Sequence, residues 1–436
     1  MPLSRSRGFP RLVAQFLLAG LFVFASAQAA AELIELKAAR VFDGEAMHEG
    51  WSVLVEDERI VFAGPSAKRP QRDVARSIAL DEHTLMPGLI EGHSHILLHP
   101  YNETPWNDQV LKESEAERVL RASVHARATL MAGVTTIRDL GSEGAGYADV
   151  AIRDAIEAGI IDGPRMLVAG PAIVATGSYG PKGFHEGVEV PLGAEAADGY
   201  DDLIRTTRRQ IGRGIDLVKV YADYRWGPEG SAAPTFTLEE LETIVEVAHS
   251  SGRAVAAHAS TAEAMRRAVL AGVEVIEHGD GATPEVLELM RQHDVALCPT
   301  LAAGDAISQY GGWRKGEEPE PARVAAKRRS FAAALKSGVA ICFGGDVGVY
   351  AHGDNVRELE MMVDYGMDPL AALRAATAGN AELFHLNDRL GRVAPGLYAD
   401  LIAVRGNPIS DVSELRDVVM VMKQGRLYRL DAGAVE

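Results

Sequence analysis

The chain has very few cysteines. Its 436 residues include only two, Cys298 and Cys342. This number excludes a small scaffold held together by disulfide bonds, and a chain of this length does not need one. Both cysteines lie in apolar runs that are expected to be neighbouring strands. We expect two buried reduced thiols, with a disulfide bridge between them as the alternative.

The chain also has little positive charge. Its 44 Lys and Arg residues against 61 Asp and Glu residues give a formal net charge of −17. An acidic surface repels nucleic acids and anionic lipids, so we expect a small-molecule or dipeptide partner with a free carboxylate and no nucleic acid. The hydrophobic content of 47% is enough for a large core and excludes a disordered chain. Assembly of identical subunits stays open.

The apolar run near the N-terminus is too short to span a bilayer comfortably, because a spanning helix needs about 20 residues. The run Leu12–Phe24 follows Arg5, Arg7 and Arg11 and precedes small residues such as Ala25-Ser26-Ala27. That order predicts a signal peptide over residues 1–31 and a periplasmic or secreted mature protein. A membrane anchor is the alternative. No cysteine follows the run, which argues against a lipid anchor.

Both ends of the remaining chain show short β-type segments. We expect strands at Leu33–Lys37, Trp51–Val55, Arg59–Ala63, Asp400–Val404, Val418–Lys423 and Arg426–Tyr428. Residues 32–87 and 391–436 are therefore predicted to form one small β-sandwich domain beside a central domain of residues 88–390.

The central domain alternates short apolar strands with amphipathic helices, which is typical of βα units. The expected strands are Leu85–Glu91, Val134–Asp139, Arg165–Ile173, Ile215–Tyr221, Ala254–His258, Glu274–His278, Val295–Pro299 and Val339–Asp346. Thr237 and Glu240 form a capping box before one helix, and Ser260 and Glu263 have the same spacing before another. Eight such units predict an α/β fold, a (β/α)8 TIM-like barrel.

Metal-binding residue types follow several of these strands. Catalytic groups of such barrels lie at the carboxyl ends of the strands. His93 and His95 end the first strand and, two residues apart, point to the same face. His258, His278 and Asp346 end the fifth, sixth and eighth strands. Each alone has an ordinary explanation as a core histidine or a turn aspartate, but together they offer the N and O donors that zinc-like ions prefer.

Lys219 lies inside an apolar strand, where an ammonium group is costly unless it is paired or neutral. Burial lowers the pKa of a lysine amine, and a neutral amine reacts with carbon dioxide to give a carbamate, an oxygen ligand able to bridge two metals. A salt bridge to an interior acid is the alternative.

The chain resembles the amidohydrolase superfamily. The resemblance rests on the stretch from Pro87 to His95, the single Lys219, the two later histidines and the final Asp346, and it covers nearly the whole mature chain. The segments Gly133–Asp139 and Val218–Tyr221 resemble the branch of metal-dependent Xaa-Pro and Xaa-Arg/Lys dipeptidases. That branch is similar to imidazolonepropionases and includes hydrolases of N-acyl amino acids such as ochratoxin. The chain lacks the glutamate that deaminase branches carry shortly after the residue matching His258.

The resemblance implies two divalent ions, expected to be zinc. His93, His95 and Asp346 would hold one ion, His258 and His278 the other, and carbamylated Lys219 would bridge both. Water activated by the metals would attack an amide carbonyl, and Asp346 would pass its proton to the leaving amine. Tyr221 would help to stabilise the oxyanion, with simple packing as its alternative role.

Four residues in the loops are weaker candidates for binding the substrate carboxylate. They are His185, Tyr224, Arg225 and His352, and for His185 a solvent-exposed role is the alternative. The predicted function is cleavage of a dipeptide or N-acyl amino acid. A cyclic-amide hydrolase or lactonase on the same site and a noncatalytic periplasmic binding protein are the alternatives.

Overall fold

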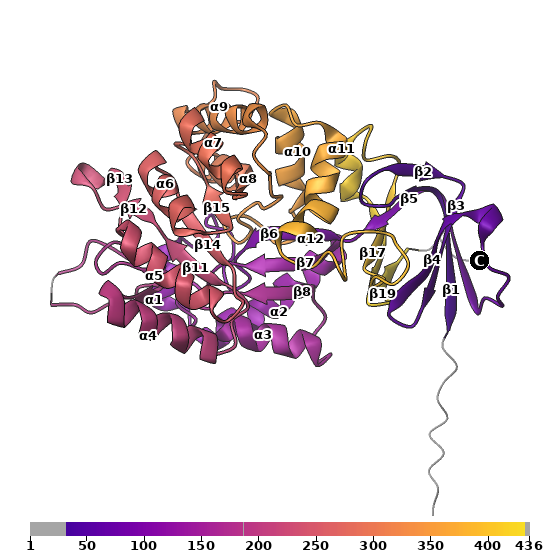
Figure 1. Ribbon diagram of the computed structural model, residues 1–436, viewed down its shortest axis with the longest axis horizontal. Helices are drawn as coiled ribbons and strands as arrows, with labels where there is room; N and C mark the ends of the chain where they lie inside the picture. The colour runs from indigo at the N-terminus through magenta and orange to yellow at the C-terminus, as the bar shows by residue number, and fades with distance from the viewer. Residues whose placement is uncertain (1–31, 186, 432–436) are drawn as a thin grey trace, which may run out of the picture.

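The two β-rich ends of the chain fold together, as the sequence predicts. The computed structural model describes residues 32–431 apart from Glu186, so the predicted signal peptide lies outside the described residues. The two ends form one eight-stranded sheet at one end of the molecule (Figure 1). Its strands are β1 (Leu33–Phe42), β2 (Met47–Glu49), β3 (Trp51–Glu56), β4 (Arg59–Pro65), β5 (Arg76–Pro87), β17 (Leu401–Arg405), β18 (Val418–Lys423) and β19 (Arg426–Leu430).

This sheet is continuous because β17 pairs antiparallel with β5 and so joins the C-terminal strands to the N-terminal ones. The order is β19-β18-β17-β5-β1-β3-β4, and β2 pairs with β1. Leu36, Val53, Ile78 and Met420 belong to its apolar core. One continuous sheet does not by itself confirm a sandwich, so the β-sandwich stays a prediction.

The middle of the chain has a TIM-barrel-like α/β fold. Its strands lie in two parallel sheets, β6-β7-β8 and β10-β9-β11-β14-β15-β16. Their bounds are β6 (Leu89–Ser94), β7 (Val134–Asp139), β8 (Arg165–Val168), β9 (Ile173–Val174), β10 (Glu195–Ala196), β11 (Val218–Tyr221), β14 (Val255–Ala259), β15 (Val275–His278) and β16 (Ala296–Cys298). A separate hairpin consists of β12 (Asp223–Arg225) and β13 (Ala232–Pro234).

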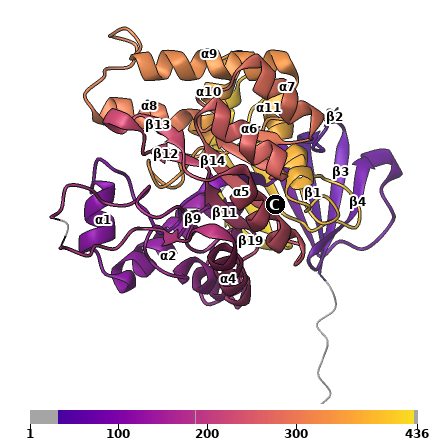
Figure 2. The same ribbon diagram turned by 60° about the vertical axis from the view of Figure 1, so that its left-hand side comes forward.

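Helices lie around the outside of these strands (Figure 2). They are α1 (Trp106–Lys112), α2 (Glu115–Met131), α3 (Ala148–Glu157), α4 (Gly199–Gly212), α5 (Leu238–His249), α6 (Ala262–Ala271), α7 (Pro284–Gln292), α8 (Leu301–Tyr310), α9 (Ala322–Ser337), α10 (Val356–Asp364), α11 (Pro369–Arg374) and α12 (Asn380–Leu383). Short turns of other helix types are η1 (Ser66–Lys68), η2 (Pro228–Gly230), η3 (Ala375–Gly379) and η4 (Val412–Arg416). No helix within the described ranges is both long and apolar enough to cross a bilayer.

The eighth expected strand, Val339–Asp346, is an extended segment without a regular ladder. Isolated bridges join Ile341 to Leu297 of β16 and Val347 to Ser94 of β6. Between them, the Gly92 amide donates to the Phe343 carbonyl at 2.8 Å and the Asp346 amide to the His93 carbonyl at 2.9 Å. The last segment therefore lies between the first and seventh strands, although the ladder around the barrel is interrupted among the described residues.

Two predicted strands are divided, both at a proline. Arg165–Ile173 becomes β8 and β9 because Pro171 has no N–H to donate and Gly170 takes a φ of +65°. The predicted strand Leu85–Glu91 spans two sheets: β5 ends at Pro87 in the small sheet, and β6 begins at Leu89 in the barrel.

The helix caps confirm one prediction and correct another. Thr237 caps α5 in a complete capping box with Glu240. Before α6, however, the capping side chain belongs to Thr261, which accepts from the Ala264 amide. The Ser260 amide instead donates to the Asp223 carboxylate at 2.8 Å, and this bond keeps Ser260 out of the capping position.

The cysteine prediction is wrong, because Cys298 and Cys342 form a disulfide with their Cα atoms 4.6 Å apart. The pairing follows from the barrel order: Cys298 ends β16, and Cys342 lies beside it on the eighth segment, where its amide donates to the Leu297 carbonyl.

Candidate metal centre and its cavity

The predicted metal ligands gather at the carboxyl ends of the barrel strands. His93, His95, His258, His278 and Asp346 all line one cavity of about 1020 Å³. They come from β6, the turn after it, β14, β15 and the end of the eighth segment. Five donors from four distant parts of the chain thus converge on one space.

The donor atoms are close enough to share metal ions. Atoms of His93, His278 and Asp346 lie within 4.8 Å of one another. Asp346 Oδ1 lies 3.3 Å from His95 Nε2 and 3.6 Å from His93 Nε2. The His258 and His278 ring centroids are 4.4 Å apart. The arrangement fits a metal centre, since these imidazole and carboxylate groups are ligands that zinc accepts.

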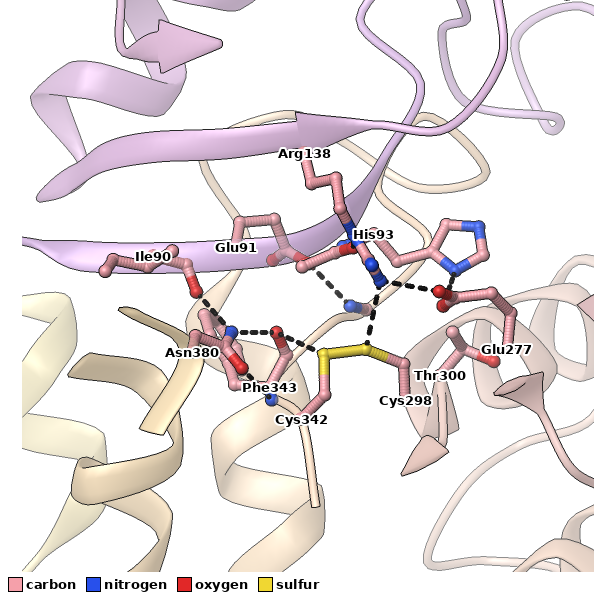
Figure 3. The surroundings of a disulfide bond; sticks show 12 residues. Ile90, Glu91, His93, Arg138, Glu277, Cys298, Thr300, Cys342, Phe343 and Asn380 are labelled. Carbon is pink, nitrogen blue, oxygen red and sulfur yellow. Dashed lines mark hydrogen bonds and ion pairs between the residues drawn. A yellow bond between two sulfur atoms is a disulfide. The ribbon is translucent and has the colours of Figure 1, made fainter. Parts of the chain in front are cut away.

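A buried chain of charged groups orients His93 (Figure 3). Glu277 Oε2 accepts from His93 Nδ1 at 2.7 Å, and Glu277 Oε1 accepts from the Arg138 guanidinium at 2.5 Å. A proton held on Nδ1 leaves the Nε2 lone pair directed to Asp346, as a metal ligand requires. Arg138 also lies 3.6 Å from Cys298 Sγ, so the disulfide packs against this chain.

Two of the other three histidines, His95 and His278, also face a neighbouring oxygen through Nδ1. His95 Nδ1 donates to the Gly141 carbonyl at 3.0 Å, and His278 Nδ1 lies 2.8 Å from Thr300 Oγ1. His258 differs, because its Nε2 faces Asp223 Oδ1 at 3.5 Å. Each ring therefore has one nitrogen toward a protein oxygen and one left for a ligand bond.

Electrostatics keep three of the histidines neutral. Burial, with Lys219 nearby, lowers the pKa of His93 well below its usual range and that of His258 to about 3. Burial and His258 do the same to the pKa of His278. Neutral imidazoles are the form that binds metal.

The ion pair between His95 and Asp346 shifts the pKa values of both groups. Burial alone would lower the pKa of His95, but the hydrogen bond to Asp346 and the charge of Glu143 raise it to about 9. Burial would raise the pKa of Asp346, and the charges of His93 and His95 hold it below its usual value. A divalent cation bound here would displace the His95 proton.

Lys219 is the sixth predicted ligand, and it is buried rather than exposed to the cavity. Its side chain is 1% exposed, and its Nζ lies 5.6 Å from the Tyr221 ring centroid. Burial lowers the pKa of Lys219 to about 8, against the opposing charges of Glu277 and Asp346. A readily deprotonated amine is what carbamate formation needs.

The Gly344-Gly345 pair before Asp346 has a packing role. A Cβ on Gly345 would lie 2.0 Å from the Tyr350 hydroxyl, and one on Gly344 would lie 2.9 Å from the His93 amide. The Glu91 carboxylate accepts from the Gly345 amide at 2.8 Å and the His93 amide at 3.1 Å. These close contacts fix Asp346 beside His93.

Only some of the residues predicted to contact the substrate line the cavity. Tyr221, Tyr224 and Arg225 line the cavity. His185 does not: it is exposed, and its Nδ1 accepts from the Gly187 amide within its own loop. His352 also lies away from the cavity lining, where its ring stacks on His125 and its Nε2 donates to the Leu98 carbonyl. Neither histidine is among the described residues that line the cavity, and their roles in substrate binding stay predictions.

The sequence analysis did not identify several cavity residues that lie outside the strands, in loops and in the first turns of helices. Glu143, Trp106 and Tyr179 line the cavity, and so do Arg323 and Lys327. Lys327 donates to the His278 carbonyl at 2.8 Å and contacts Asp280. The only signal in the sequence was their position just after strands or at helix starts, which many unrelated residues share.

Comparisons with known proteins agree with this geometry. A family model described as "Amidohydrolase family" matches residues 84–428. Ochratoxinase of Aspergillus niger is 29% identical over 89% of this chain and 84% of its own length. A solved Xaa-Pro dipeptidase with bound methionine is 30% identical with a TM-score of 0.81, covering 91% of this chain and 100% of that one. A prolidase complexed with N-methylphosphonate-L-proline is 28% identical with a TM-score of 0.76, covering 92% of this chain and 100% of the other.

Proposed function

The chain belongs to the amidohydrolase family and is a hydrolase acting on amide C–N bonds, and on that premise we propose that it is a two-metal enzyme that cleaves dipeptides or N-acyl amino acids. The reaction would release a free C-terminal amino acid. The observation that carries the proposal is the convergence of four histidines and Asp346 on one cavity above buried Lys219.

The ligands divide into two sets in this proposal. His93, His95 and Asp346 would hold one zinc ion, His258 and His278 the other, and carbamylated Lys219 would bridge them. When bound, the ions would polarise the amide carbonyl and lower the pKa of water. The depressed pKa of Lys219, about 8, supports the carbamate, because part of the amine is then neutral near physiological pH.

Residues of the chain would transfer the proton of the attacking water and donate a hydrogen bond to the oxyanion. Asp346, 3.3 Å from His95 Nε2, is placed to take a proton from the attacking water and return it to the leaving amine. Tyr221 stacks on His258 with ring centroids 4.5 Å apart, and we assign its hydroxyl the role of donor to the developing oxyanion.

The substrate carboxylate would be bound at the cavity rim. Tyr224 and Arg225 line the cavity, and a guanidinium is suited to bidentate binding of a carboxylate. The names of the dipeptidase, prolidase and ochratoxinase relatives support an amide whose leaving group is an amino acid. The signal-type N-terminal sequence supports action in the periplasm or outside the cell.

Matched substrates with a free or amidated C-terminus test the proposal. Hydrolysis of the free acid should be at least about tenfold more efficient in kcat/KM, because amidation removes the charge that Arg225 would pair with. Arg225→Gln should reduce this preference, and Arg208→Gln, at an exposed position on α4, should leave it unchanged. Equal efficiency for both substrates would refute carboxylate binding. Cleavage of cyclic amides alone would refute the substrate class.

A further inference from the structure

Aromatic side chains surround a buried carboxylate on one side of the cavity. The aromatic residues come from the segment after β6, the start of α1, the segment after β9, the end of β11 and β12, and the carboxylate follows β7. We call this group the aromatic cage; all its members line the cavity, and they are Tyr101, Trp106, Tyr179, Tyr221 and Tyr224 around Glu143.

Tyr179 lies at the centre of the cage. Its ring centroid is 5.3 Å from that of Trp106, 4.7 Å from that of Tyr221 and 4.8 Å from that of Tyr224. The rings meet at angles of 74°, 51° and 62°, so they do not stack flat on one another. Tilted rings of this kind present faces and edges to a common space.

Glu143 is held rigidly within this group. It is 3% exposed, takes a left-handed φ of +49°, and its Oε2 accepts from both Trp106 Nε1 and the Tyr179 hydroxyl at 2.8 Å. The other oxygen, Oε1, lies 3.7 Å from His95 Nδ1. The imidazole of His95 therefore separates Glu143 from Asp346, which places the cage beside the reacting centre.

Among the described residues, the ion-pair partner of this carboxylate is the His95 imidazole alone. Within residues 32–431 apart from Glu186, no Lys or Arg forms an ion pair with Glu143. Arg118 donates to the backbone carbonyls of Leu97, Ser142 and Glu143 rather than to the Glu143 carboxylate. Arg225 approaches the Tyr224 ring only to 5.9 Å, near the outer limit for a cation–π contact.

A buried carboxylate whose ion-pair partner among the described residues is only an imidazole favours a further cation, and aromatic faces attract cations. We propose that the aromatic cage binds a cationic group of the substrate, an ammonium or guanidinium carried by the residue next to the scissile amide. This inference rests on the proposed function and narrows it, because it favours dipeptides with a free amino terminus or a basic side chain over neutral acyl amino acids.

Isosteric substrates test the cage directly. Each pair consists of a cationic substrate and a neutral substrate of nearly the same shape. Lysine is compared with norleucine, and arginine with citrulline, at each of the two positions of a dipeptide. A free amino terminus is compared with an acetylated one. At one position the cationic member should have a kcat/KM higher by about 10- to 100-fold. Glu143→Gln should bring that ratio close to one, and Glu157→Gln, on the exposed face of α3, should leave it as in the native protein. Equal kcat/KM for every pair would overturn the inference.

Additional variants and a direct binding assay test the cage independently of Glu143→Gln. If Glu143→Gln does not fold, two other variants test the cage. Tyr179→Phe removes one hydrogen bond to the carboxylate, and Tyr224→Leu removes one ring. Each should lower the ratio of kcat/KM between the cationic and the neutral substrate. Tetramethylammonium chloride should quench the Trp106 fluorescence of the native protein, and neutral tert-butanol should not, with Trp106→Phe as the control. Cation binding without amide hydrolysis would refute only the proposed function. Hydrolysis without cation preference or binding would refute only the cage.

Discussion

The buried ion pair between Glu277 and Arg138 should determine both the stability of the barrel and the metal affinity of His93. Glu277 is 0% exposed and Arg138 is 3% exposed. The two carboxylate oxygens of Glu277 bind different partners, His93 Nδ1 at 2.7 Å and the Arg138 guanidinium at 2.5 Å. One side chain thus neutralises a buried cation and orients the imidazole of a candidate metal ligand.

Glu277→Gln keeps the shape of the side chain and removes its charge. Arg138 would then be a buried cation without a partner, which destabilises a protein by about 3–5 kcal/mol. If the new amide group donates to His93 Nδ1, the ring proton moves to Nε2, and that nitrogen can no longer bind a metal. Loss of such an orienting partner typically lowers metal affinity about 10- to 100-fold.

Urea unfolding and zinc titration of the same preparations measure the two effects. The double variant Arg138→Met/Glu277→Gln should be less destabilised than the sum of the single variants, because it no longer buries an unpaired charge. The double variant should still bind zinc weakly, since it lacks the carboxylate that orients His93. Native stability and native zinc affinity in Glu277→Gln would refute this reasoning.

Three further predictions concern the centre and its support. Burial lowers the pKa of Lys219 to about 8, so about a tenth of the amine is neutral at pH 7, against about 0.03% for an unperturbed lysine. The NMR signal of a carbamate formed from ¹³C-bicarbonate should therefore grow as pH rises from 7 to 9. A signal that persists in Lys219→Ala would contradict the assignment. Asp346→Asn should slow turnover by about 10²–10⁴-fold with an unchanged circular dichroism spectrum, whereas near-native turnover would exclude its role as base. Replacing Cys298 and Cys342 by serine removes a cross-link between residues 44 apart and should lower the free energy of unfolding by about 4 kcal/mol. Unchanged stability in urea would show that the disulfide contributes little.

The regular parts of the fold could be predicted because they repeat a simple pattern. The strand Val134–Asp139 has the predicted bounds, β14 is shifted by one residue at both ends, and β15 begins one residue later than predicted. Apolar runs buried on both faces leave a strong signal in the sequence. The break at Gly170-Pro171 was also readable in principle, since a proline cannot donate within a strand.

The residues at the candidate metal centre could be predicted because functional groups of such barrels lie at the strand ends, whereas no comparable rule places loop residues. His93, His258 and His278 follow from counting strands, whereas Glu143 and Tyr179 lie in irregular segments whose paths depend on contacts far along the chain. His185 also lies in an irregular segment, and it is not among the described residues that line the cavity. The disulfide depends on a Cα separation of 4.6 Å that only the barrel order creates.

Metal-dependent release of a free amino acid is the most direct test of the account. Purified protein should contain about two equivalents of zinc-like metal per chain and release an amino acid from a dipeptide or N-acyl amino acid. Complete removal of the metal by a chelator should abolish the release, and added zinc should restore it. Undiminished release from fully metal-free protein would contradict the account.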